Sequence, residues 1–230
     1  MIKLLICDLD GTLAEPGKQI SPSTLNYLKA IENCNVGIAL CSGKPVYYLC
    51  GLARQLGLKN PILIGENGLD FQVGIDLPPK LFFCQKCAKY VEKNLTWLQN
   101  QISKLFDENI WFQPNKKAVT VFPRKEDDYA VIRDFLDKNK NRLEGLTVYE
   151  HNDCFDILPS KINKKMAIEK ACKLLNVKKE EIIAIGDGIN DYPMFECSDL
   201  PIGIHVKDPS KVKLNFDDID SALEYIKKMF

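Results

Sequence analysis

Cys7-Asp8-Leu9-Asp10-Gly11-Thr12-Leu13 directly follows a mainly apolar run at residues 2–6. Such a run predicts a buried parallel strand with both aspartates at its carboxyl end. Two carboxylates this close repel each other unless a cation offsets their charge, and Mg²⁺ prefers oxygen ligands. A carboxylate beside Mg²⁺ can also attack a phosphoryl group. Alternatively, the strand simply ends in a solvated, aspartate-rich turn, so this stretch alone leaves both interpretations open.

Length and charge narrow the class of protein. A chain of 230 residues accommodates one ordinary domain and a second, smaller one. Its 31 basic and 31 acidic residues balance, so it lacks the basic footprint of a nucleic-acid binder. No apolar stretch approaches the length that spans a bilayer, and residues 1–3 lead into the first strand without a secretory signal. We therefore expect a soluble, cytoplasmic protein with no nucleic-acid and no membrane partner.

The nine cysteines mostly lie inside apolar segments, where a free thiol behaves as a small hydrophobe. Only Cys84 and Cys87 have the spacing of metal ligands, at what we predict to be the start of a helix. No second pair and no nearby histidine completes a zinc site there. We therefore expect reduced, structural thiols.

Two parts of the chain alternate between strand and helix patterns. This alternation predicts an α/β fold with a doubly wound parallel sheet and right-handed crossovers. Helical patterns beginning at Ser21 and Val46 separate the first strands, and a helix pattern follows Ser160. The predicted strands of this sheet are residues 2–6, 36–41, 61–64, 182–185 and 202–204, and a terminal helix is predicted at 219–226.

Residues 71–157 have a different pattern. Two helices are predicted there together with four strands in hairpins, at residues 110–113, 118–122, 147–150 and 154–158. This grouping predicts a smaller α+β module with an open antiparallel sheet. The chain then divides into a discontinuous core domain, residues 1–70 and 158–230, and an inserted domain, residues 71–157.

Polar residues stand at the predicted carboxyl ends of the core strands, where the active site of a doubly wound sheet lies. Asp8 ends the first strand, Ser42 ends the second, and Asp187 and Asp191 follow residues 182–185, while Lys164 begins the helix after the insert. The last stretch, Gly186-Asp187-Gly188-Ile189-Asn190-Asp191, fails the dinucleotide fingerprint at its third glycine. An aspartate pair there suits a cation instead.

Two other kinds of site find little support in the sequence. The chain has only two histidines, His151 and His205, and neither accompanies a Gly-x-Ser-x-Gly elbow. No Gly-x-x-x-x-Gly-Lys-Ser/Thr phosphate loop occurs either. His151 falls in a predicted turn of the insert, where it is either a solvated turn residue or a residue that faces substrate.

Residues 8–13 resemble the first motif of the haloacid dehalogenase superfamily of phosphohydrolases, and three later stretches match its remaining motifs in order. The place of the insert is similar to that of a type II cap, as in Cof-like (type IIB) sugar phosphatases and archaeal-type phosphoglycolate phosphatases. The resemblance implies a Rossmann-like core with a cap domain. It also implies Mg²⁺-dependent hydrolysis of a phosphomonoester of a small metabolite, phosphoglycolate or a sugar phosphate, through an aspartyl-phosphate.

By the same resemblance, Asp8 is the nucleophile and a Mg²⁺ ligand. Asp10 would act as general acid and then general base, and would give only its backbone carbonyl to the metal. Asp187 would be a direct metal ligand, and Asp191 either a ligand or a partner of one. Two carboxyls in unlike environments can divide the roles of nucleophile and acid.

The resemblance also assigns the phosphate-binding residues. Ser42 and Gly43 would bind the phosphoryl group through a hydroxyl and backbone amides, and Asn190 is a further candidate. Lys44 departs from the family, which usually has Thr-Gly-Arg where this chain has Ser-Gly-Lys.

Lys164 matches the family lysine that neutralises the phosphoryl oxygens and holds the nucleophile. Lys161 and Lys165 replace the two glycines of the family pattern, so Lys165 is the alternative; spacing favours Lys164. Two other functions stay open: a phosphotransferase similar to phosphomannomutase, and a metabolite-binding regulator that has lost turnover.

Overall fold

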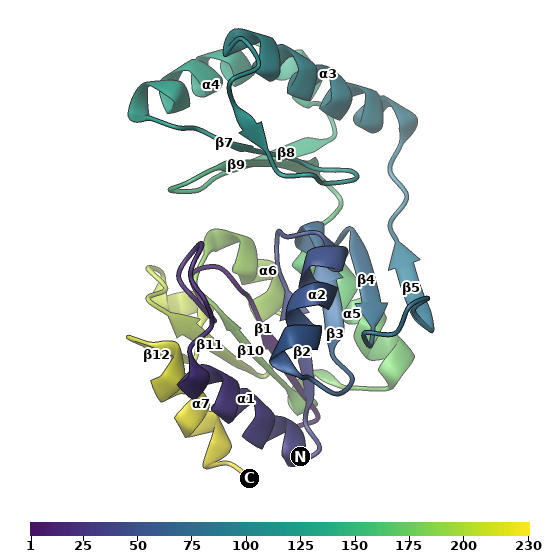
Figure 1. The fold of residues 1–230 in the computed structure, drawn as a ribbon, viewed down its shortest axis with the longest axis vertical. Helices are drawn as coiled ribbons and strands as arrows, with labels where there is room; N and C mark the ends of the chain where they lie inside the picture. Colours follow the sequence, from purple (N-terminus) through teal and green to yellow (C-terminus); the bar gives the residue numbers. More distant parts are fainter. The chain divides into compact units, whose positions relative to one another are not determined.

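A computed structural model describes all 230 residues of the chain, which form two compact units. The core unit comprises Met1–Cys84 and Asn163–Phe230, and the inserted unit comprises Gln85–Ile162. Figure 1 shows the ribbon of each unit. The sequence placed these boundaries at 70/71 and 157/158, whereas the compact units divide at 84/85 and 162/163.

The core unit contains one eight-stranded sheet in the order β12-β11-β10-β1-β2-β3-β4-β5. Six of its strands are parallel, as expected for a doubly wound sheet, while β4 and β5 run antiparallel to their neighbours. The prediction of an α/β fold built on a parallel sheet is confirmed. The strands are β1 (Leu4–Cys7), β2 (Gly37–Cys41), β3 (Ile62–Gly65), β4 (Asp70–Val73), β5 (Leu81–Cys84), β10 (Ile182–Gly186), β11 (Leu200–Ile204) and β12 (Leu214–Phe216).

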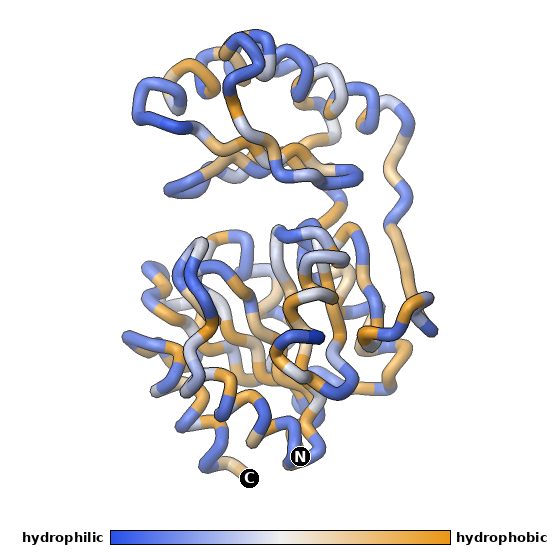
Figure 2. Tube along the Cα trace, in the orientation of Figure 1, coloured by the Kyte–Doolittle hydropathy of each residue, from blue (hydrophilic) through white to orange (hydrophobic).

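Helices cover both faces of this sheet, which explains why its central strands are apolar at every position (Figure 2). In β1, Leu5 and Cys7 pack in one hydrophobic cluster, and Leu4 and Ile6 pack in another on the opposite face. The first cluster includes residues of α1 (Pro22–Asn33), α2 (Val46–Leu56) and α7 (Ile219–Lys227). The second includes residues of α5 (Lys164–Leu175) and α6 (Tyr192–Phe195).

The antiparallel hairpin of β4 and β5 was not predicted. Its residues extend the core sheet, with Ile62 of β3 opposite Val73 of β4. Polar Asp70 and Gln72 are buried in β4, so the strand lacks the apolar run that marks the central strands. The prediction that Cys84 and Cys87 open a helix is wrong, because Cys84 ends β5 and the next helix begins at Lys89.

The inserted unit is a four-stranded antiparallel sheet, in the order β6-β7-β9-β8, packed on two helices. This is the open sheet that the hairpin pattern predicted. Alternate residues of β7 and β9 face the helices, among them Val121 and Ile157, while Thr120 and Asp156 lie opposite each other on the other face. The elements are α3 (Lys89–Leu105), β6 (Trp111–Phe112), β7 (Val119–Phe122), α4 (Glu126–Lys138), β8 (Leu146–Glu150) and β9 (Phe155–Pro159).

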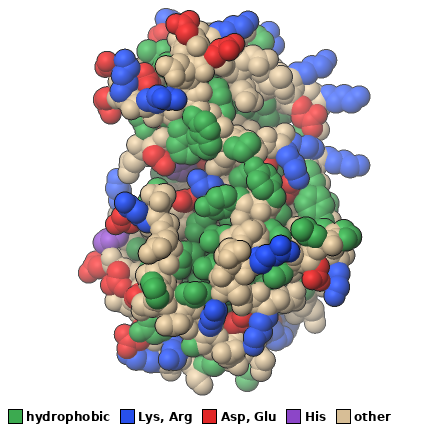
Figure 3. Space-filling view, in the orientation of Figure 1, with side chains coloured by type: hydrophobic (Ala, Val, Ile, Leu, Met, Phe, Trp, Pro, Cys, Tyr) green, Lys and Arg blue, Asp and Glu red, His purple; other side chains and the backbone are tan.

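Charged side chains of both signs are scattered over the visible face of the molecule, without one large region of a single sign (Figure 3). None of the helices combines the length and the apolar character that crossing a bilayer requires.

Candidate active site

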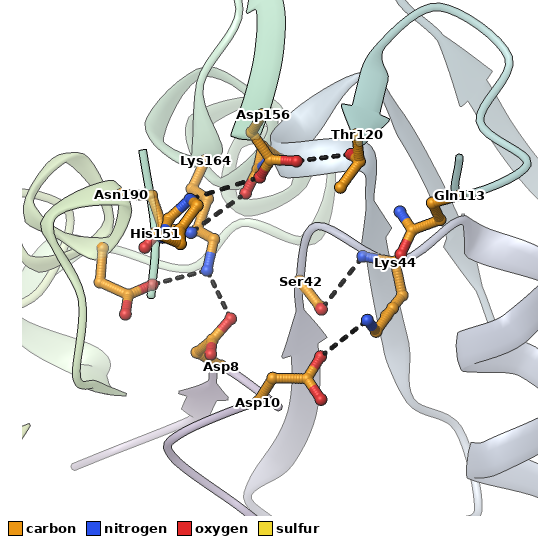
Figure 4. Close-up of polar contacts among 12 residues, drawn as sticks. Asp8, Asp10, Ser42, Lys44, Gln113, Thr120, His151, Asp156, Lys164 and Asn190 are labelled. Carbon is orange, nitrogen blue, oxygen red and sulfur yellow. Dashed lines mark hydrogen bonds and ion pairs between the residues drawn. The ribbon is translucent and has the colours of Figure 1, made fainter. Parts of the chain in front are cut away.

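The predicted site residues of the core unit meet at the carboxyl ends of adjacent strands. Asp8 follows β1, Ser42 follows β2 and Asp187 follows β10, and these strands are neighbours in the sheet. Figure 4 shows Asp8, Asp10, Ser42 and Lys164 converging on this edge. Parallel strands therefore bring together side chains that lie up to about 180 residues apart in the sequence.

Lys164 is fully buried and lies between two carboxylates. Its Nζ donates to Asp8 Oδ1 at 2.5 Å and to Asp191 Oδ1 at 2.6 Å. The position follows from local structure, because Asn163 caps α5 with its side chain and Lys164 is the first helical residue. Lys165, the alternative left open by the sequence, instead points to the surface and pairs with Glu196 at 2.7 Å.

Three carboxylates form an acidic cluster. One oxygen from each of Asp8, Asp187 and Asp191 lies within 4.8 Å of the others. Asp191 supports its neighbours, since its Oδ2 accepts hydrogen bonds from the backbone N–H groups of Asp187 and Gly188, both at 3.0 Å. Thr12 donates to Asp187 Oδ1 at 2.8 Å, a contact that the sequence did not reveal.

Burial and crowding disfavour the ionised forms of Asp8 and Asp187. Burial is the main reason that the pKa of Asp8 is raised to about 8; Lys164 opposes this rise, and the charges of Asp191 and Asp187 contribute to it. Burial and the Asp191 charge likewise raise the pKa of Asp187 to about 6. Burial opposes the charge of Lys164, yet Asp191 and Asp8 keep its pKa well above the ordinary value.

These charges make the cluster suitable for a divalent cation. Three carboxyl groups face one ammonium in a buried place, so a cation of higher charge would favour the ionised forms that burial disfavours. The donors are all carboxylate oxygens, the hard ligands that Mg²⁺ prefers. Asp8, Asp187 and Asp191 are thus the residues that fit such an ion.

Asp10 lies apart from the acidic cluster. Its Oδ2 is 3.4 Å from Nζ of Lys44, and both side chains are partly exposed. Lys44, whose role the sequence left in doubt, therefore lies beside the predicted general acid. Gly11 next to it has φ +89°, and a Cβ there would lie only 2.7 Å from Cγ of Asp187, so glycine is required.

The loop after β2 holds the predicted phosphate-binding residues. Ser42 is buried, and its Oγ accepts a hydrogen bond from the N–H of Lys44 at 3.1 Å. Its carbonyl accepts one from the N–H of Asn67 at 3.0 Å. Asn190 donates to Oδ1 of Asn67 at 3.4 Å. Asn67 was not among the residues that the sequence singled out.

The inserted unit carries a row of polar side chains, which we call the polar row: Gln113, Asn115, Thr120, Asp156 and His151 (Figure 4 draws four of them with labels). Gln113 donates to Asn115 at 2.7 Å, Asn115 to Thr120 at 2.9 Å, and Thr120 to Asp156 at 2.5 Å. His151 Nε2 lies 3.5 Å from Asp156 Oδ2. Of these residues, the sequence had singled out only His151 as a possible substrate contact.

The profile of the haloacid dehalogenase-like hydrolase family matches residues 5–70 and 82–215. The chain is 26% identical to the phosphoglycolate phosphatase of Methanococcoides burtonii, over 93% of this chain and 88% of that protein. It is 27% identical to the phosphoglycolate phosphatase of Metallosphaera sedula, over 91% and 88%.

Solved structures share the fold. A haloacid dehalogenase-like hydrolase from Bacteroides thetaiotaomicron superposes with a TM-score of 0.77 at 18% identity, covering 98% of this chain and 100% of that one. A sugar phosphatase of haloacid dehalogenase subclass IIB gives 0.71 at 17% identity, covering 97% and 98%.

Replacing Lys164 by methionine should destabilise the protein strongly. Asp8 and Asp191 would remain buried without their ammonium, which typically costs about 3–5 kcal/mol. Urea unfolding at neutral pH measures the loss, and Lys165→Met, which removes a surface ion pair, is the matched control and should change stability far less. Equal losses in the two variants would contradict the placement of Lys164.

Magnesium should raise the melting temperature more at pH 8 than at pH 5. The folded pKa values of Asp8 and Asp187, about 8 and about 6, lie above those of unfolded aspartate, so the metal-free protein loses stability as pH rises through this window. Mg²⁺ binds the ionised carboxylates, so its stabilising effect grows over the same range. Thermal unfolding with MgCl₂ and with EDTA measures the difference.

Asp187→Asn should lose most of this Mg²⁺ effect, while Asp208→Asn, on an exposed loop, should keep it. A shift that is independent of pH, or one that survives in Asp187→Asn, would show that the cation binds elsewhere.

Proposed function

This chain belongs to the haloacid dehalogenase-like hydrolases, and we propose that it is a Mg²⁺-dependent phosphatase that acts through an aspartyl-phosphate. One observation carries most weight. A fully buried lysine orients Asp8 at the carboxyl end of β1, with Asp187 and Asp191 beside it. This arrangement combines a nucleophile with ligands for a cation that neutralises phosphoryl charge when bound.

In the proposed first step, a carboxylate oxygen of Asp8 attacks phosphorus, and the bond from phosphorus to the leaving oxygen breaks. Lys164 holds the carboxylate in one orientation through Oδ1, which favours an in-line approach. The product of this step is an aspartyl-phosphate and an alcohol.

Asp10 would provide the proton for the leaving alcohol. It lies two residues from the nucleophile but outside the acidic cluster, partly exposed and next to Lys44. In the second step it would take a proton from water as the water oxygen attacks the phosphorus of the aspartyl-phosphate. Asp8 and inorganic phosphate are then released, and Asp10 carries the proton for the next turnover.

Ser42, the amide of Gly43, Asn190 and Lys164 are the proposed phosphoryl ligands. They provide donors from the loop after β2, from the loop after β10 and from the start of α5. Preorganised donors aimed at the transferring group are the main source of catalysis in phosphoryl transfer.

The proposed substrate is phosphoglycolate or a sugar phosphate. The curated relatives named above are phosphoglycolate phosphatases, and their sequences are 26% and 27% identical to this chain. The choice among esters is therefore a matter for measurement. We further propose that the inserted unit selects among esters through its polar row. Buried hydrogen-bonding side chains discriminate between ligands that satisfy them and ligands that do not.

The test is phosphate release from a panel of metabolite phosphates, with Mg²⁺ and with EDTA. Hydrolysis that needs the metal supports the proposal. An isomeric sugar phosphate in place of inorganic phosphate would identify a phosphotransferase. Failure to hydrolyse any ester would indicate a binding protein without turnover.

Asp10→Asn should affect alkyl phosphates more than aryl phosphates. An alkyl leaving group needs the proton in the first step, and losing general acid catalysis costs about 10²- to 10⁴-fold. Steady-state kinetics with one ester of each kind measures the ratio, and Asp8→Asn is the control that should abolish both reactions. Equal losses on the two esters in Asp10→Asn would argue against its role as acid.

Thr120→Val should change the preference among esters. It keeps the shape of the side chain but breaks the polar row between Asn115 and Asp156. We expect ratios of kcat/KM between natural esters to shift by up to about tenfold, because each buried hydrogen bond contributes about 1 kcal/mol. Thr96→Val on α3 is the matched control. Unchanged ratios would exclude the polar row from substrate selection.

A further inference from the structure

Residues Glu66, Asn67 and Gly68 form a buried segment with an unusual backbone. Their φ angles are 48°, 54° and 106°, all in the left-handed region. Glu66 and Asn67 are almost completely buried, with 1% and 3% of their surface accessible to solvent. Non-glycine residues seldom adopt this conformation, and it persists where the surrounding structure enforces it, often at functional sites.

This segment holds the loop that follows β2. The N–H of Asn67 donates to the carbonyl of Ser42 at 3.0 Å, and the N–H of Glu66 donates to the carbonyl of Lys44 at 2.9 Å. Both ends of the loop that carries Ser42 and Gly43 are thus bound to the left-handed segment.

The same segment reaches the two other sources of phosphate ligands. Oδ1 of Asn67 accepts a hydrogen bond from Nδ2 of Asn190 at 3.4 Å. Gly68 lies against the cap of α5, where an added Cβ would be 2.8 Å from the carbonyl carbon of Asn163, the residue before Lys164. Residues 66–68 therefore contact the loop after β2, the loop after β10 and the start of α5.

We propose that Asn67 is a positioning residue that sets the geometry of the phosphate site through Asn190 and Ser42; the inference rests on the proposed function. Asparagine fits this place for two reasons. It tolerates the left-handed conformation better than most residues, and its side chain offers an acceptor. The amide of Asn190 has two N–H groups, so donating one to Asn67 fixes the side chain and leaves the other for a phosphate oxygen.

The experiment measures the dissociation constant of inorganic phosphate by calorimetry in the presence of Mg²⁺, so that its outcome does not depend on turnover. Asn67→Gly keeps the left-handed backbone and removes the acceptor. It should weaken phosphate binding about three- to tenfold, the effect of one hydrogen bond. KM should rise more than kcat falls. Asn35→Gly, at φ 63° on the exposed turn before β2, is the matched control and should leave binding unchanged.

A double-mutant cycle separates positioning from general destabilisation. Asn190→Ala should weaken phosphate binding, and Asn67→Gly should add little in that background, because its effect passes through Asn190. An unchanged dissociation constant in Asn67→Gly would overturn the inference. So would a weakening by Asn67→Gly that is as large in the Asn190→Ala background as in the wild-type protein. If Asn67→Gly does not fold, Asn190→Ala alone decides, since unchanged phosphate binding there removes the proposed route.

The failure of the proposed function has a different signature. A wild-type protein that binds phosphate but hydrolyses no ester would contradict the phosphatase proposal. The dissociation constants of the variants would still test the role of Asn67.

Discussion

The buried ammonium of Lys164, shared between Asp8 and Asp191, is the interaction on which the site depends. It joins the end of β1, the loop after β10 and the first turn of α5. Lys164 is 156 residues from Asp8 in the sequence and 27 residues from Asp191. Without this ammonium, the carboxyl groups of Asp8 and Asp191 would be buried beside each other with no opposite charge between them. A buried charge of this kind is tolerated only when it is paired and hydrogen-bonded, as here.

The same interaction bears on the roles proposed for the neighbouring aspartates Asp8 and Asp10. Asp8 is buried against Lys164, whereas Asp10 is partly exposed and contacts Lys44. Two residues of one motif thus have unlike surroundings, which is the condition for one carboxyl to act as nucleophile and the other as acid. The crowding of carboxyl groups around Asp8, which disfavours their ionised forms, also accounts for the proposed need for a divalent cation.

The sequence was sufficient to predict those parts of the structure that depend on the local pattern of apolar and polar residues. β1 is apolar throughout because both its faces are covered. Lys164 was preferred to Lys165 from its spacing in the family motif, and the structure places Lys164 as the first residue of α5. The hairpin of β4 and β5 escaped prediction because Asp70 and Gln72 interrupt its apolar pattern while remaining buried. Asn67 and the contact of Thr120 with Asp156 escaped as well, since the partners are 123 and 36 residues apart and come together only when strands and loops are placed in the fold.

The central claim is that Asp8 takes the phosphoryl group before water does. The most direct measurement is acid-quench mass spectrometry of Asp10→Asn after mixing with an aryl phosphate, a substrate whose leaving group needs little protonation. The account predicts that phosphate accumulates on the peptide that contains Asp8, because attack by water then lacks its base. Product formation with no labelled Asp8 peptide, or a label that persists in Asp8→Asn, would contradict it.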